Sequence, residues 1–112
     1  MTPTPGQQFY GQQLAYLAAR DIETLVEAQY AEDGCLIAFD YVVQGKAALK
    51  EYFRSYLDRL GFIRLVSTDK FRETRDAIFF EATVETKLGV VRVYDALVLR
   101  DGKITHHFAG LK

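Results

Sequence analysis

The chain has 112 residues, of which 49% are hydrophobic and 26% are charged, with 14 basic and 15 acidic side chains. This length and balance are typical of one ordinary globular domain. A net charge of −1 does not provide the basic surface that nucleic-acid binding requires. The longest apolar run, Ala77 to Phe80, is far shorter than the roughly 20 residues that span a bilayer. We therefore expect neither a nucleic-acid-binding nor a membrane protein.

The chain starts with MTPTPGQQFYG, which has neither the basic start nor the apolar core of a secretory signal. Its one cysteine, Cys35, cannot form an internal disulfide, as is usual in a reducing compartment. We expect a cytoplasmic protein that has a flexible N-terminal lead-in over residues 1–6 and a single domain over residues 7–112.

Apolar residues at helical spacing predict three helices. The first is expected over residues 7–19, and Asp21 is the predicted N-cap of a second that ends before Gly34. The segment 30–53 reads as a helix end, a short apolar strand, a turn and an amphipathic helix. Gly61 closes this third helix. Its apolar stripe consists of Ala48, Leu49, Tyr52, Phe53, Tyr56, Leu57 and Leu60.

Beyond Gly61 the apolar period changes to two, which predicts three or four further strands. The dipeptide Asp101-Gly102 between alternating residues indicates a hairpin with a two-residue loop. Its predicted register pairs Leu99 with Ile104, Leu97 with His106, and Asp95 with Phe108. A second turn at Leu88-Gly89 is expected to pair Val84 with Val93, Ala82 with Asp95, and Phe80 with Leu97.

These registers divide the strands into two faces. The face that is predicted to pack against the helices is apolar apart from Asp95 and His106. Its apolar members are Phe80, Ala82, Val84, Val91, Val93, Leu97, Leu99, Ile104 and Phe108. The opposite face is mixed, and it is too apolar in places to be left bare, so we expect a homodimer through it. This face is predicted to include Thr83, Tyr94, Ala96, Val98, Thr105, His107, Ala109 and Leu111.

Asp95 is the strongest candidate for a catalytic residue. A carboxylate on an apolar strand face must be hydrogen-bonded or kept protonated by desolvation, and a protonated Asp can donate a hydrogen bond to a developing oxyanion. The other interpretation is a buried structural acid that a tyrosine or a backbone group satisfies. His106 is predicted one diagonal step away, so the two form a candidate acid–base pair. The alternative is a structural pair in which acid and histidine satisfy only each other. His107 is predicted on the opposite face, so the two histidines should not hold a metal ion, and we expect neither a metal site nor a cofactor.

Two further sets of residues belong to the predicted site. Asp40 follows the short strand, where it is either a base in a pocket or the first residue of a turn. Large side chains on the facing surfaces are the candidate walls of a pocket. These candidate ligand-binding residues are Tyr16, Tyr52, Phe53, Tyr56, Phe80, Val93, Leu97 and Phe108.

Three segments carry a resemblance to a known family: YAED at 30–33, QGKAALKEYF at 44–53 and LRDGKI at 99–104. With these segments the chain resembles the SnoaL-like branch of the nuclear transport factor 2 superfamily, which includes the ketosteroid isomerases. The resemblance implies an α+β, cystatin-like cone of three N-terminal helices on a strongly bent, mostly antiparallel sheet. The implied element order is α-α-β-α-β-β-β-β.

The resemblance also bears on the chemistry. In the isomerases an Asp in the penultimate strand donates a hydrogen bond to an oxyanion, and Asp95 is similar in position. Their proton-shuttling Asp corresponds to Ala38 here. The leading hypothesis is a protein that binds a small apolar or weakly polar molecule in the cone, either as an isomerase- or cyclase-like acid–base catalyst or without catalysis. The alternative is a non-catalytic dimeric module that binds a ligand or another protein.

Overall fold

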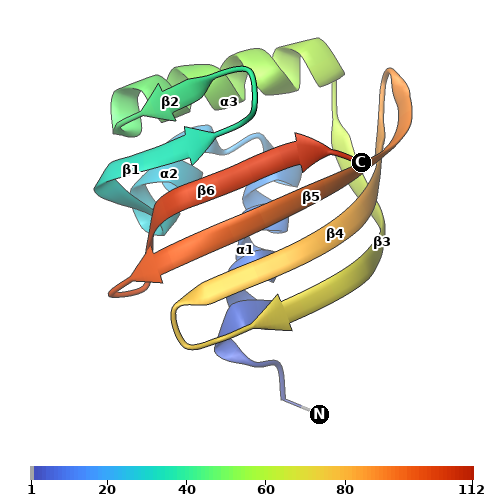
Figure 1. Ribbon diagram of the computed structural model, residues 1–112. Helices are drawn as coiled ribbons and strands as arrows, with labels where there is room; N and C mark the ends of the chain where they lie inside the picture. The colour runs from blue at the N-terminus through green and yellow to red at the C-terminus, as the bar shows by residue number, and fades with distance from the viewer. Residues whose placement is uncertain (1) are drawn as a thin grey trace.

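The computed structural model describes residues 2–112, while Met1, which belongs to the predicted lead-in, lies outside the described residues. Figure 1 shows three helices on one side of a curved sheet. The helices are α1 (Pro5–Ala19), α2 (Ile22–Gln29) and α3 (Lys46–Leu60). The strands are β1 (Tyr30–Ile37), β2 (Val42–Gln44), β3 (Ile63–Glu73), β4 (Ala77–Thr86), β5 (Gly89–Arg100) and β6 (Lys103–Leu111).

The six strands form one sheet in the order β2-β1-β6-β5-β4-β3. All neighbours are antiparallel except β1 and β6, which run parallel. The predicted α+β cone is therefore confirmed, with the three-residue strand β2 as an addition to the predicted order. Within residues 2–112, no helix has both the length and the apolar character needed to cross a membrane.

Helix α1 begins at Pro5, two residues before the predicted start. Thr4 is its N-cap in a capping box: the Thr4 hydroxyl oxygen accepts a hydrogen bond from the Gln7 N–H, and the Gln7 side-chain oxygen accepts one from the Thr4 N–H. The carboxylate of Glu73, at the end of β3, accepts hydrogen bonds from the Gly6 N–H and the Thr4 hydroxyl. The end of the predicted lead-in is thus part of the helix and is held to the sheet.

The segment after α2 was predicted as the end of a helix, and this prediction is wrong. Helix α2 stops at Gln29, and β1 starts at Tyr30, which is fully buried and pairs with Ile104 of β6. The pairing of β1 with β6 is irregular between Tyr30 and Cys35. Gly34 permits this bulge, because an added Cβ would lie 2.7 Å from the carbonyl oxygen of Ile104.

The hairpin of β5 and β6 follows the predicted register only next to its turn. Leu99 pairs with Ile104 as predicted, but Val98 pairs with His106, so Thr105 is an extra residue in β6. Beyond this bulge Leu97 faces His107 and Asp95 faces Ala109. A shift of one residue moves every later side chain to the other face. The predicted positions of His106, His107, Phe108, Ala109 and Leu111 are therefore wrong.

The hairpin of β4 and β5 also differs from its predicted register, but with a milder result. Val84 pairs with Val91, and Ala82 pairs with Val93. Both pairs differ from the prediction by two residues, so each side chain remains on its predicted face. The concave face therefore presents Phe80, Ala82 and Val84 to the helices, as predicted.

A glycine substitution tests the bulge in β1. We expect Gly34→Ala to lower the free energy of unfolding by about 1–3 kcal/mol, because the new methyl group collides with the backbone of β6. Gly11→Ala is the matched control, since Gly11 lies on α1 with open space around it, and there alanine should stabilise by about 1 kcal/mol. Urea unfolding followed by circular dichroism measures both. A Gly34→Ala protein as stable as the parent would contradict the close approach of β1 to β6.

Candidate functional site

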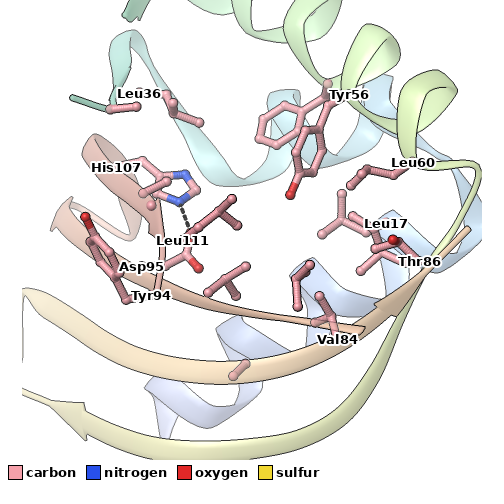
Figure 2. Close-up of a pocket in the computed structure, with 18 of the residues that line it drawn as sticks. Leu17, Leu36, Tyr56, Leu60, Val84, Thr86, Tyr94, Asp95, His107 and Leu111 are labelled. Carbon is pink, nitrogen blue, oxygen red and sulfur yellow. Dashed lines mark hydrogen bonds and ion pairs between the residues drawn. The ribbon is translucent and has the colours of Figure 1, made fainter. Parts of the chain in front are cut away.

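A cavity of about 580 Å³ lies between the concave face of the sheet and helices α1 and α3. Its size falls in the range of small-molecule sites in proteins. Its wall is mostly apolar and aromatic, with Tyr10 and Leu17 from α1, Tyr56 from α3, and Ala82 and Val93 from the sheet. Figure 2 shows these elements around the open space. The wall thus suits a small molecule with an apolar body.

Five of the eight predicted ligand-binding residues line this cavity, namely Tyr52, Phe53, Tyr56, Phe80 and Val93. The other three are not part of the lining.

Each of these three has a different position. Leu97 is fully buried in the core, and Tyr16 packs against the core from α1. Phe108 is 41% exposed, because the bulge at Thr105 turns it to the outer face of the sheet.

Asp95 lies in the cavity wall, on the face where it was predicted. Its partner is His107, whose Nε2 is 2.7 Å from Oδ1 of Asp95. The two side chains are 16% and 6% exposed, respectively. Figure 2 shows this pair at one end of the cavity, opposite Leu17, Leu60 and Thr86. The other carboxylate oxygen, Oδ2, has no hydrogen-bond partner within residues 2–112, so it is available to a ligand.

The far side of His107 is also hydrogen-bonded. Its Nδ1 lies 2.7 Å from the hydroxyl oxygen of Tyr30, which is completely buried. The planes of the two rings are inclined at 28°, with centroids 6.2 Å apart. Tyr30, His107 and Asp95 therefore form a row of side chains that runs from the core to the cavity, and below we call it the Tyr30–His107–Asp95 row.

The other two predicted catalytic candidates lie elsewhere. His106 is exposed on the outer face, where its ring stacks on Phe108 and its Nδ1 is 3.1 Å from the Thr105 hydroxyl oxygen. The structure therefore separates His106 from Asp95. Asp40 lines the outer part of the cavity wall and is exposed. It belongs to the tight turn that the Ala38 N–H closes by donating to the Tyr41 carbonyl.

Tyrosine hydroxyls supply hydrogen-bond donors near the cavity. Burial raises the pKa of Tyr56, and the negative charge of Asp95 raises it further. The pKa of Tyr10 is raised by burial, against the effect of its hydrogen bond with Thr68. Both hydroxyls are therefore protonated at neutral pH. The Tyr56 hydroxyl points into the cavity in Figure 2 and has no hydrogen-bond partner within the part of the chain that the structure describes.

This arrangement has the parts of an acid–base site. A carboxylate with a free oxygen accepts a proton, and a neutral tyrosine hydroxyl donates a hydrogen bond to an oxygen that gains negative charge. The surrounding apolar wall strengthens both interactions, because it excludes water. Among residues 2–112 there is no cluster of three or more His, Cys, Asp or Glu side chains arranged to hold a metal ion.

Sequence reasoning missed two members of the site, His107 and Tyr30. The prediction of a histidine diagonal to Asp95 was correct in geometry, but it named the neighbouring residue because no sequence signal marked the bulge at Thr105. Tyr30 was assigned to a helix end. No local pattern marks a buried strand at Tyr30, because Glu32 and Asp33 are exposed and interrupt the buried residues of β1.

Comparison with known proteins shows the fold. No protein-family model and no curated protein matches the sequence of the chain. An NTF2-like protein from Anabaena variabilis superposes with a TM-score of 0.81 at 20% identity, over 100% of this chain and 94% of that chain. A protein from Shewanella putrefaciens, named as a SnoaL-like polyketide cyclase, superposes with a TM-score of 0.82 at 10% identity, over 97% of this chain and 80% of that chain.

A third structure was solved with a small molecule. TerC, co-crystallised with polyporic acid, superposes with a TM-score of 0.79 at 21% identity, over 97% of this chain and 92% of that chain. All three identities are low, so these likenesses establish the architecture alone. The chain has the NTF2-like cone fold that SnoaL-like proteins share.

The two adjacent histidines provide a matched test of the site geometry. We expect His107→Phe to lower the free energy of unfolding by about 2–3 kcal/mol, because it leaves the Tyr30 hydroxyl and the Asp95 carboxylate without their partner. His106→Phe should change it by less than about 0.5 kcal/mol, because that side chain is exposed. Chemical unfolding compares the two variants, and the reverse order would mean that His106 is the buried histidine.

Proposed function

We propose that this protein binds a small apolar, ring-containing molecule in the cavity and that Asp95 acts on it as a general base. The observation that carries this proposal is the Asp95–His107 pair in the wall of a cavity of about 580 Å³. The fold of a SnoaL-like polyketide cyclase and the polyporic acid bound by TerC support a ligand of this kind.

The proposed reaction is proton transfer at a carbon beside a carbonyl group. The Oδ2 atom of Asp95 takes the proton, and the electron pair of the C–H bond moves onto the carbonyl oxygen, giving an enolate. The Tyr56 hydroxyl donates a hydrogen bond to that oxygen. Where a C=C bond adjoins the acidic carbon the product is a dienolate, and return of the proton from Asp95 to its far carbon, as the C=O bond re-forms, is an isomerisation. Attack of the enolate carbon on a second carbonyl closes a ring, and the alkoxide that results takes the proton from Asp95. Both outcomes start from the same step.

Binding is tested with N-phenyl-1-naphthylamine, a neutral apolar probe whose fluorescence rises in apolar surroundings. We expect micromolar binding by the parent protein, and at least tenfold weaker binding by Ala82→Phe and Val93→Phe, which fill the floor of the cavity. Val66→Phe is the matched control, because Val66 is 57% exposed on β3 and lies outside the cavity lining. Equal probe binding by all four proteins would place the probe outside the cavity and contradict the binding proposal.

Catalysis is tested with 2-tetralone, a bicyclic ketone with acidic hydrogens beside its carbonyl. In D₂O the protein should accelerate exchange of these hydrogens, and Asp95→Asn should reduce the acceleration by about 10²–10⁴-fold, the usual contribution of a general base. Proton NMR of the ketone measures the rate. If 2-tetralone binds but exchanges equally fast with the parent and the Asp95→Asn protein, the site binds without catalysis.

We propose in addition that two copies associate through the convex side of the sheet. Phe79, Ala96, Phe108 and Ile37 form one row across β4, β5, β6 and β1. Phe79 and Phe108 are 52% and 41% exposed in this row, so the convex side presents a contiguous apolar strip of the kind that a partner covers. This outer row supports the alternative function, a dimeric interaction module, as well as a dimeric enzyme.

Association is tested by light scattering at micromolar concentration. We expect a dimer mass for the parent protein and a monomer mass for Phe108→Glu, because the new charge lies in the middle of the outer row. Phe62→Glu changes an exposed phenylalanine outside this row and should remain dimeric. A monomer mass for the parent protein would remove the dimer from the proposal and leave the cavity unaffected.

A further inference from the structure

Tyr30 takes part in the site without reaching the cavity. Tyr30 is the first residue of β1 and is fully buried. Its ring packs against the ring of Phe53, with centroids 6.0 Å apart. Its hydroxyl oxygen has one hydrogen-bond partner within residues 2–112, the Nδ1 of His107 at 2.7 Å. Its hydrogen-bonded connection to Asp95 therefore passes through His107, whose Nε2 is 2.7 Å from the carboxylate.

The protons along the Tyr30–His107–Asp95 row can be counted. Burial raises the pKa of Tyr30 well above its ordinary value, so the hydroxyl keeps its hydrogen at neutral pH. If this hydrogen is donated to Nδ1, the Nε2–H donates to Asp95 and every group is paired. If Nδ1 carries a hydrogen instead, the buried tyrosine hydrogen has no acceptor, a situation that folded proteins avoid.

The charge of His107 affects how readily Asp95 accepts a proton. Burial is the largest cause of the raised pKa of Tyr10, Tyr30 and Tyr56, and the charge of Asp95 contributes to it. The same cavity is also lined by Asp40, Tyr52, Arg59 and Tyr94, and the guanidinium of Arg59 lies over the Tyr56 ring, 5.8 Å from its centroid. Among residues 2–112, only His107, when protonated, would place a positive charge within ion-pair distance of Asp95. A carboxylate beside an imidazolium holds its negative charge more firmly, so it accepts a proton from a ligand less readily.

We propose that Tyr30 is a positioning residue that keeps His107 in the neutral, Nε2-protonated form, so that Asp95 stays an effective base. This role rests on the proposed function of Asp95. It requires no contact between Tyr30 and a ligand, and Tyr30 is absent from the cavity lining. Tyr30 is buried in the core at the start of β1, while Leu36 on the same strand lines the cavity.

The test uses the ligand-free protein labelled with ¹⁵N. Two-bond ¹H–¹⁵N spectra at neutral pH report whether each imidazole nitrogen carries a hydrogen. We expect the parent protein to show an unprotonated Nδ1 and a protonated Nε2 for His107. His106 is the internal reference, because it is exposed and lies outside the Tyr30–His107–Asp95 row.

Tyr30→Phe removes only the hydroxyl and keeps the ring, so the packing against Phe53 is retained. We expect the Nδ1 signal of His107 to move towards the protonated position in this variant. We also expect kcat for 2-tetralone exchange to fall about tenfold with KM unchanged, because the cavity wall is intact. Tyr16→Phe is the matched control, since Tyr16 lies outside the cavity lining and should leave both readouts unchanged.

Two results would overturn the proposal. One is a protonated Nδ1 of His107 in the parent protein at neutral pH, which needs no variant to fold. The other is an unchanged His107 spectrum in Tyr30→Phe. Failure of the proposed function gives a different result, because acceleration of 2-tetralone exchange is then absent with every protein. The positioning role is then also wrong, even where the imidazole signals of the parent protein and of Tyr30→Phe are as expected.

Discussion

A carboxylate on the concave face of the sheet is the constraint on which much of this structure depends. Asp95 stands between apolar side chains, where an unpaired charge would cost several kcal/mol. The hydrogen bond to His107 reduces that cost, and it exists only because Thr105 adds one residue to β6. A regular β6 would turn His107 to solvent and leave Asp95 with the apolar ring of Phe108 on its own face.

The same constraint extends to the next strand. His107 is buried, so its second nitrogen also needs a partner, and Tyr30 supplies one from β1. Tyr30 reaches this position because β1 bulges after it, and Gly34 leaves room for the bulge against β6. Irregularities in two neighbouring strands therefore serve a single polar row, which is consistent with the tendency of bulges to lie beside functional sites.

The cavity itself has a structural cost. A void of about 580 Å³ removes contacts that would otherwise hold α1 and α3 to the sheet. The helices keep their places through contacts outside the void: Glu73 binds the start of α1, and Lys50 and Arg54 of α3 form ion pairs with Glu23 of α2. Most of the stabilisation comes from the apolar core beside the cavity, where Leu25 of α2 and Leu49 and Leu57 of α3 are buried against the sheet, because exposed ion pairs contribute little.

The sequence by itself determined the architecture and one member of the site. Helical spacing marked α3, the Asp101-Gly102 turn marked the last hairpin, and the alternation of apolar residues placed Asp95 on the inner face. These features can be predicted because they depend on local periodicity and on the residues of the turn, both of which are visible in a short stretch of sequence. Errors of two residues in the β4–β5 register were harmless, because they preserve the face of each side chain.

Only the tertiary structure decided which histidine joins Asp95. The bulge at Thr105 lies at the point where β6 pairs with β5 on one side and with β1 on the other, so its position depends on two strands distant in sequence. The place of Tyr30 was decided in the same way, by the pairing of β1 with β6 across 74 residues rather than by the helix before it. The sequence shows the alternation of a strand, but it does not show where a bulge adds one residue and reverses the two faces. The position of the bulge is determined by pairing with strands distant in sequence and by the burial that this pairing allows.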